Sequence, residues 1–229
     1  MEVTKDSSSV VDLKYQGREA RRANSKQRRR KILEAALRIV VREGVRGVRH
    51  RAVAKEAEVP LSATTYYFKD ITDLISDAFT LFVEMGVEAF SDFWQDSESQ
   101  LQAAANSLDN TDEAREAFVN NMTELAVGYV QAQLEHHRDL IIVERCFQIE
   151  CIRNDNLRPI AYRHQRCFLE SLENFFEQMG SAQPAIDARL FASIINQVEY
   201  DALVREKPVD FKLARVLLRR QVELMLGSS

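Results

Sequence analysis

Residues 59–70 read VPLSATTYYFKD, and this short stretch combines hydroxyl groups, aromatic rings and a lysine. Serine and threonine hydroxyls can hydrogen-bond to bases or phosphates, and alanine or threonine methyl groups can meet a thymine methyl. The hydroxyls of Tyr66 and Tyr67 can reach phosphate oxygens, and Lys69 offers them a positive charge. The small residues 62–65 would let the backbone approach closely. The chemistry that this stretch predicts is recognition of a nucleic acid.

Charge is divided unevenly along the chain. Residues 1–74 contain 17 lysine and arginine residues against 10 acidic ones, whereas residues 75–229 contain 14 against 25. A basic first third suits a polyanion, and the acidic remainder would be repelled by one. We therefore expect two parts with different roles.

The sequence offers little for catalysis or metal binding. His136 and His137 are adjacent, so on a helix they point about 100° apart and cannot both face one ion. His164 and Cys167 could face each other, but no carboxylate partner can be placed beside them. No glycine-rich phosphate loop, GxSxG or HExxH motif is present. We expect no enzyme activity, no cofactor and no metal.

The composition favours long helices. Only 7 glycines and 4 prolines interrupt 229 residues, of which 45% are hydrophobic. No apolar run approaches the ~18 residues that would suggest a membrane span, and the N-terminus has no secretory signal. The three cysteines are an odd, sparse set, typical of reduced thiols. These features predict an all-α protein in the cytoplasm.

Hydrophobic periodicity predicts the elements that must position residues 59–70. Asn24 and Gly44 are expected to bound the first helix, Thr111 to cap a later one, and Gly180 to end another. The predicted helices cover residues 25–43, 49–57, 61–67, 71–93, 112–136, 138–152, 158–179, 185–205 and 211–226.

Two short helices that follow a longer amphipathic helix form a helix-turn-helix pattern. In that motif the second helix enters the major groove with its N-terminal residues on base edges. Here the second helix is residues 61–67, which carry the hydroxyl groups. We predict a flexible basic arm at residues 1–24, a helix-turn-helix DNA-binding domain at 25–70 and a larger helical domain at 71–229.

Three consecutive segments of the first third read ILEAALRIVVREG, VAKEAEV and TTYYFKDITDLI. They resemble the patterns ILxAAxxLFxxxG, IAxxAGV and YxHFxxKxxL of the TetR family of bacterial transcriptional regulators. The resemblance covers about residues 32–81. It implies that Tyr66 and Lys69 contact phosphates and that Arg51 lies at a position often used against DNA. It also implies that Phe68 packs in the core.

The chain departs from the family pattern at several positions. Glu58 stands where glycine usually makes the turn, so a strain of roughly 1 kcal/mol is expected there. Tyr67 replaces a usual histidine, Thr65 a usual aromatic residue, and His50 occupies a usually apolar position. The predicted DNA contacts are Arg49, Arg51, Leu61, Ser62, Ala63, Thr64, Thr65, Tyr66, Tyr67 and Lys69.

The resemblance also implies a ligand pocket and a dimer interface in the C-terminal helices. The apolar residues expected at the pocket are Phe82, Met85, Trp94, Phe118, Met122, Tyr129 and Phe147. The expected interface residues, on the helices near 158–179 and 185–205, are Phe168, Leu172, Phe175, Phe176, Leu190, Ile194, Ile195 and Val198. The same apolar stripes could instead fill the core of one monomer.

The basic run REARRANSKQRRRK spans residues 18–31. Arg18, Arg21 and Arg22 precede the expected first helix, so a flexible arm could place them in the adjacent minor groove. Alternatively, the arm is a solvated tail that does not touch DNA.

These observations predict a homodimeric DNA-binding regulator, expected to repress transcription, that binds a palindromic operator. A small-molecule effector would release it by moving the two reading heads away from the spacing of about 34–36 Å that successive major grooves require. Two alternatives stay open: a helical interaction protein whose basic arm binds RNA or an acidic partner, and a helical enzyme. Duplex-specific binding to one palindrome separates the regulator from both.

Overall fold

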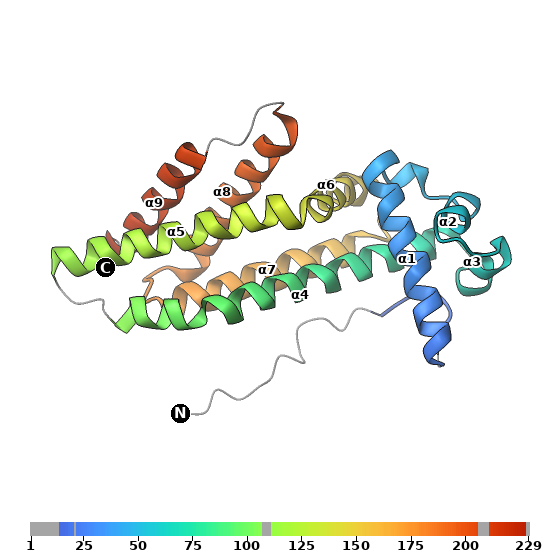
Figure 1. Cartoon of the computed structure of the whole chain (residues 1–229), viewed down its shortest axis with the longest axis horizontal. Helices are drawn as coiled ribbons and strands as arrows, with labels where there is room; N and C mark the ends of the chain where they lie inside the picture. The colour runs from blue at the N-terminus through green and yellow to red at the C-terminus, as the bar shows by residue number, and fades with distance from the viewer. Residues whose placement is uncertain (1–13, 21, 107–110, 206–210, 228–229) are drawn as a thin grey trace. The chain divides into compact units, whose positions relative to one another are not determined.

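The computed structural model describes residues 14–20, 22–106, 111–205 and 211–227, with the backbone only for residues 90–106 (Figure 1). Within these ranges all regular structure is helical, which confirms the predicted fold class. The elements are α1 (Ala23–Glu43), the short 3-10 helix η2 (Val45–Gly47), α2 (His50–Glu56), α3 (Leu61–Tyr67), α4 (Ile71–Asn106), α5 (Asp112–His136), α6 (Arg138–Arg153), α7 (Arg158–Gln178), α8 (Pro184–Val204) and α9 (Phe211–Gly227).

Most helix ends follow the predicted signals. Gly44 ends α1 with a φ of 71°, and Gly180 follows α7 with a φ of 79°. The Thr111 hydroxyl accepts a hydrogen bond from the backbone N–H of Ala114, as expected of an N-cap.

Two predicted boundaries were wrong. The first helix begins at Ala23 rather than residue 25, and its N-cap is Arg22, whose side chain makes no capping bond. Helix α4 continues to Asn106 instead of ending near residue 93. Residues 94–106 contain no glycine or proline, and the glutamine, glutamate and alanine residues among them favour continuation of a helix.

The chain packs as two compact units that do not follow the predicted division at residue 70. Unit 1 comprises residues 1–88 and 139–167, and unit 2 comprises residues 89–138 and 168–229. The first part of α4 therefore belongs with the helix-turn-helix, because its apolar face needs α1 on one side and α6 on another. Local periodicity cannot show which distant helix supplies that partner.

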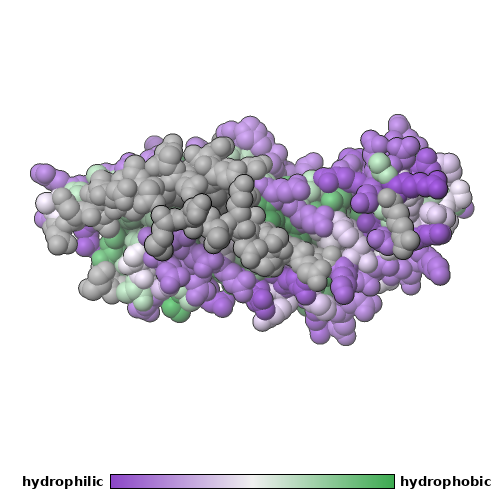
Figure 2. All heavy atoms as spheres, turned by 90° about the horizontal axis from the view of Figure 1, so that it is seen from below, coloured by the Kyte–Doolittle hydropathy of each residue, from purple (hydrophilic) through white to green (hydrophobic). Residues whose placement is uncertain are grey.

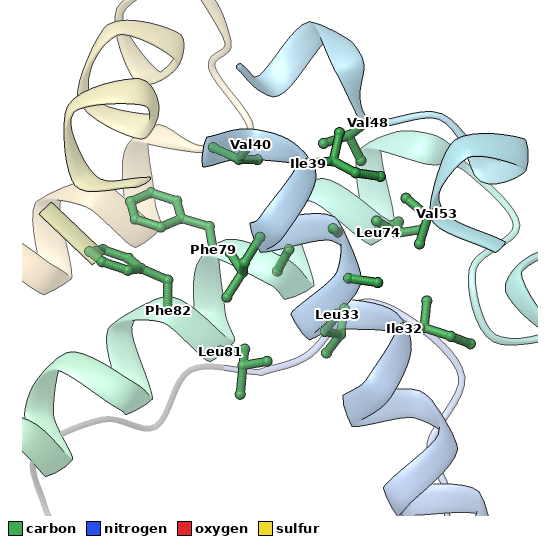
Figure 3. Close-up of a cluster of buried hydrophobic side chains, with 14 of the residues drawn as sticks. Ile32, Leu33, Ile39, Val40, Val48, Val53, Leu74, Phe79, Leu81 and Phe82 are labelled. Atoms are coloured by element: carbon green, nitrogen blue, oxygen red, sulfur yellow. The ribbon is translucent and has the colours of Figure 1, made fainter. Parts of the chain in front are cut away.

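The core of unit 1 joins α1, α2, α4 and α6 (Figure 3). Ile32, Leu33 and Ile39 of α1 are almost fully buried with Leu74 of α4. Further along α4, the Phe79 ring stacks on the Phe147 ring of α6 with 4.2 Å between centroids. This packing holds the short helices α2 and α3, which are too short to be stable alone.

The core of unit 2 joins α5, α7, α8 and α9. Phe118 of α5 and Leu172 of α7 are buried together with Val222 of α9. At the edge of this core, the Arg215 and Arg219 guanidinium groups of α9 form ion pairs with the Glu124 and Glu116 carboxylates of α5 at 2.6 and 2.8 Å. The guanidinium groups lower the pKa of both carboxyls. In the described part of the chain, no helix has the length and apolar character needed to cross a membrane.

Candidate nucleic-acid interface and ligand cavity

The turn between α2 and α3 has the backbone that a helix-turn-helix needs. Glu58 has a φ of 52°, in the left-handed region, and the Val59 N–H donates to the Ala54 carbonyl at 3.0 Å. Pro60 is the N-cap residue of α3. The turn therefore forms although a glutamate occupies its left-handed position, where a glycine would avoid the steric cost.

Helix α3 presents one face to solvent. Leu61, Ser62, Thr65 and Tyr66 are exposed, and 52% of the Tyr66 surface is accessible. Ser62, Thr65 and Tyr66 carry hydroxyl groups, so a duplex that approached this face would meet hydrogen-bonding groups beside the apolar Leu61 side chain. Ala63 is only partly buried and packs at the edge of the unit 1 core.

Two predicted contacts lie on the other face of α3. Thr64 is fully buried, and its hydroxyl donates to the Leu61 carbonyl at 2.8 Å. Tyr67 is 5% exposed, and its hydroxyl lies 2.9 Å from the Ser25 hydroxyl. The structure thus removes Thr64 and Tyr67 from the predicted contact set, because the helix turns both side chains inward.

The residues after α3 supply a charge and a helix start. Phe68 is fully buried, which confirms its predicted packing role, and Lys69 is exposed. The Asp70 carboxylate accepts a hydrogen bond from the Thr72 N–H at 2.9 Å, and this bond lowers the Asp70 pKa. The Asp70 side chain therefore caps the start of α4.

Two arginines near the helix-turn-helix are exposed and form no ion pair with a described residue. Arg49 and Arg51 are exposed at the start of α2. By contrast, Arg38 and Arg42 of α1 are already paired with the Glu56 carboxylate, at 2.8 Å each. In the view of Figure 2 the surface of α1–α3 is mostly hydrophilic. Basic side chains that form no ion pair, together with hydroxyl groups, are the groups that bind the phosphates of a DNA backbone.

The segment before α1 differs from the expected flexible arm. Residues 14–20 pack against unit 1, and the backbone N–H groups of Gln16 and Gly17 donate to the buried Asp77 carboxylate at 2.5 and 2.9 Å. The Arg29 guanidinium pairs with the same carboxylate at 2.5 Å. Burial raises the pKa of Asp77, and these hydrogen bonds and the Arg29 charge oppose that rise. Of the predicted minor-groove arginines Arg18, Arg21 and Arg22, Arg21 lies outside the described residues, as do residues 1–13 of the expected arm.

Unit 2 contains a small apolar cavity. The volume of this cavity is about 30 Å³. With the lining side chains in their present conformations, the cavity can hold water but not an organic ligand. The lining residues come from α5, α7, α8 and α9: Met122, Leu125, Ala126, Tyr129, Phe168, Leu172, Phe175, Phe176, Phe191, Val222 and Met225. Five of these are aromatic and none carries a charge.

The predicted pocket residues are divided among three places. Met122 and Tyr129 line the unit 2 cavity, and Phe118 is buried in the nearby core. Phe82 and Phe147 are buried in unit 1, and Met85 packs at the edge of that core. The Trp94 side chain lies outside the described residues. Sequence analysis missed the α9 side of the cavity, although its buried residues follow the helical spacing Ala214, Leu218, Val222 and Met225.

Most of the predicted interface residues point into unit 2. Phe168, Leu172, Phe175 and Phe176 of α7 line the cavity, and Ile195 and Val198 of α8 are buried. Ile194 is partly buried, while Leu190 is 46% exposed. The α7 stripe therefore fills the core of one chain, the alternative that the pattern left open.

Exposed apolar residues lie instead on α8 and α9. On α8 these are Ile186, Leu190, Tyr200 and Val204, and on α9 they are Leu213, Val216, Leu217 and Leu224. At about 100° per residue, the four side chains of each set fall within roughly 100° of the helix circumference, so each set lies on one helix face. Each of these helices of unit 2 therefore carries an exposed apolar stripe, a feature of surfaces that mediate association.

The described residues contain no group of three histidine, cysteine or acidic side chains placed to hold a metal. Burial raises the pKa of the Cys146 thiol and raises that of Cys151 to about 11. Both thiols are therefore poor nucleophiles near neutral pH.

Comparisons with known proteins agree with this geometry. A family model described as "Tetracyclin repressor-like, C-terminal domain" matches residues 113–226. A TetR-family member from Streptomyces coelicolor has 26% identity and a TM-score of 0.57, and the alignment covers 85% of this chain and 98% of that one. The multidrug binding protein EbrR, complexed with ethidium, has 27% identity and a TM-score of 0.57 with the same coverage.

A transcriptional regulator from a Rhodococcus species has 16% identity and a TM-score of 0.61, over 87% of this chain and 96% of that one, which is a likeness of fold. No curated protein sequence matched the chain. The helix-turn-helix of α1–α3, the match over α5–α9 and these related structures show that the chain belongs to the TetR family of ligand-responsive, DNA-binding transcriptional regulators.

Proposed function

We propose that two copies of the chain bind a palindromic operator as a repressor, with one α3 in the major groove of each half-site, and that an apolar effector releases them. The observation that carries the proposal is the exposed face of α3, which presents Ser62, Thr65 and Tyr66 and is followed by the exposed Lys69. In this complex Ser62 and Thr65 contact base edges, and Tyr66 and Lys69 contact phosphates.

The cavity of unit 2 is the proposed effector site. Its lining favours an uncharged molecule with aromatic or aliphatic groups, since a desolvated charge would find no opposite charge there. The neighbouring carboxylates of Glu116 and Glu124 are already paired with arginines. The proposed effector thus differs from ethidium, a cation that EbrR binds.

An effector must enlarge this cavity before it can bind. Met122 and Met225 have unbranched side chains that can adopt other rotamers, and the Phe191 ring is only partly buried. A ligand that binds the enlarged cavity stabilises that conformation over the contracted one. This differential affinity is the free energy available to weaken operator binding.

The exposed stripes of α8 and α9 are the proposed dimer surface. Each chain carries one α3, so a palindrome requires a second copy. The proposal replaces the α7 residues, which are buried within one chain, with the exposed Leu190, Tyr200 and Val216.

The roles of the α3 residues can be separated by measuring binding to a set of operator variants. Tyr66→Phe and Lys69→Ala should weaken binding by a similar factor on every duplex, because phosphate contacts carry no sequence information. Thr65→Ala should change the preferred base at one position of each half-site, by about 1–3 kcal/mol between bases. If Lys69→Ala changed the preferred sequence and left the overall affinity unchanged, the proposed docking would be incorrect.

A further inference from the structure

The segment Tyr15–Arg18, which we call the strap, is attached to unit 1 at several points. The Tyr15 hydroxyl donates to the Glu84 carboxylate at 2.5 Å, and the Arg29 guanidinium lies 4.2 Å from the centroid of the Tyr15 ring. Gln16 and Gly17 bind the Asp77 carboxylate through their backbone N–H groups. The strap is therefore built onto α1 and α4, although it has no regular secondary structure.

Gly17 fits this position because it has no side chain. A Cβ atom there would lie 2.7 Å from two carbons of the Phe68 ring and 2.9 Å from an Asp77 carboxylate oxygen. Phe68 and Asp77 are both fully buried, so neither has room to move away. Close approach of the strap to the core thus depends on glycine.

The C-terminal end of the strap contacts helix α3. The Arg18 N–H donates to the Tyr67 carbonyl, in the last turn of α3, at 2.8 Å. The Arg18 guanidinium lies 4.3 Å from the centroid of the exposed Tyr66 ring. A cation over a ring face uses none of its N–H donors, so those of Arg18 stay available for a ligand.

Arg18 differs from several other arginines of unit 1 because it forms no ion pair with any described residue. Arg29, Arg30, Arg38 and Arg42 are paired with carboxylates. An exposed guanidinium that is held over the ring of an exposed tyrosine and forms no ion pair is suited to a phosphate group, which it can bind through two parallel hydrogen bonds.

We propose that Arg18 is a DNA-binding residue that contacts the backbone phosphate beside Tyr66, and that Gly17 and Asp77 are positioning residues that hold it there. This inference rests on the proposed docking of α3 on duplex DNA. The strap would then have a fixed position in the protein–DNA interface, whereas the sequence led us to expect a flexible arm in the minor groove.

The test measures the affinity of the full-length protein for its operator duplex across a range of salt concentrations. Arg18→Ala should weaken binding equally on all operator variants and should flatten the slope of log affinity against log salt by about 0.9 for each Arg18 in the complex. Arg18→Lys keeps the charge and should retain the slope. Arg115→Ala, which removes an exposed arginine from unit 2, is the charge-matched control and should change neither quantity.

The positioning role is tested with Gly17→Ala. It should reproduce the loss of slope seen in Arg18→Ala, and the double variant should lose no more than either single variant, because both changes remove one contact. Gly86→Ala is the matched control, since a Cβ there meets no atom within 4 Å.

Each result has a distinct meaning. If wild-type protein shows no salt-dependent duplex binding, the proposed function fails. If wild-type protein binds but Arg18→Ala has unchanged affinity and slope, only the inference about Arg18 is overturned. A selective loss of A·T preference beside the half-sites would overturn the phosphate assignment in favour of the minor groove.

Discussion

At the scale of single residues, His164 shows how burial changes a titratable group. Its imidazole packs against the Phe82 ring with 5.5 Å between centroids, and burial lowers the His164 pKa. A depressed pKa means that the unfolded chain binds the proton more readily than the folded one. The stability that neutral His164 contributes is therefore present above the ordinary histidine pKa of about 6.5 and is lost as the pH falls toward the folded-state pKa.

We expect the free energy of unfolding to decrease between pH 7.5 and pH 5.5, and to decrease less in His164→Asn. Denaturant unfolding at several pH values measures this. His136→Gln, which replaces an exposed histidine at the end of α5, is the control for loss of a histidine elsewhere. An identical pH dependence in wild type and His164→Asn would contradict the account.

Residue identity could be predicted from the sequence better than residue orientation. The stretch 59–70 correctly indicated which helix carries the hydroxyl groups, and Phe68 packs as expected. The inward orientation of Thr64 and Tyr67 depends on how α3 is rotated about its axis against the neighbouring helices. The seven residues of α3 have no clear division into a polar and an apolar face, so the sequence does not specify this rotation. The role of Gly17 also depends on a distant carboxylate, Asp77, that no local pattern reveals.

At the scale of elements, the turn between α2 and α3 contains a removable strain. Among the described residues, Glu58 is the only non-glycine residue with a positive φ, which is 52°. Glu58→Gly should raise the free energy of unfolding by up to about 1 kcal/mol, because the left-handed penalty of about 1–2 kcal/mol is partly offset by the greater freedom of glycine in the unfolded chain. Thermal and denaturant unfolding measure the change, and a loss of stability would show that the turn is unstrained.

The stripes on α8 and α9 lead to a prediction about assembly. Val216 is 63% exposed, so Val216→Glu should give a folded, helical monomer by analytical ultracentrifugation. Leu172 is 1% exposed within unit 2, so Leu172→Ala should keep the dimer but lose about 2–5 kcal/mol of stability. The opposite pattern, a dimeric Val216→Glu protein and a folded Leu172→Ala monomer, would place the interface on α7.

The elements themselves were largely predictable because their apolar periods and caps are local. The assignment of α7 to an interface was wrong because an apolar stripe predicts that a helix face is buried, but it does not show whether the same chain or a second copy buries it. The shared core of Phe168 and Leu172 with Met122 of α5 and Val222 of α9 shows that one chain covers it.

At the scale of the whole molecule, the cavity predicts which ligands control DNA binding. Uncharged aromatic compounds such as naphthalene derivatives should raise the melting temperature, because binding to the folded state stabilises it. Ethidium should give a smaller shift at the same concentration. Val222→Trp should fill the cavity and abolish the shift, whereas Ile152→Trp, at an exposed position of α6 outside the proposed dimer surface, is the control for the cavity. A larger shift with ethidium would contradict the proposed effector class.

The central claim is that two α3 helices read a palindrome, and selection from random DNA duplexes followed by binding measurements tests it most directly. The account predicts an enriched inverted repeat whose half-sites are centred about 34–36 Å apart, bound by two chains or a multiple of two. An isolated half-site should bind far more weakly, and Thr65→Ala should alter the selected sequence within each half-site. Equal affinity for selected, random and single-stranded sequences, unchanged by substitutions on α3, would contradict the account.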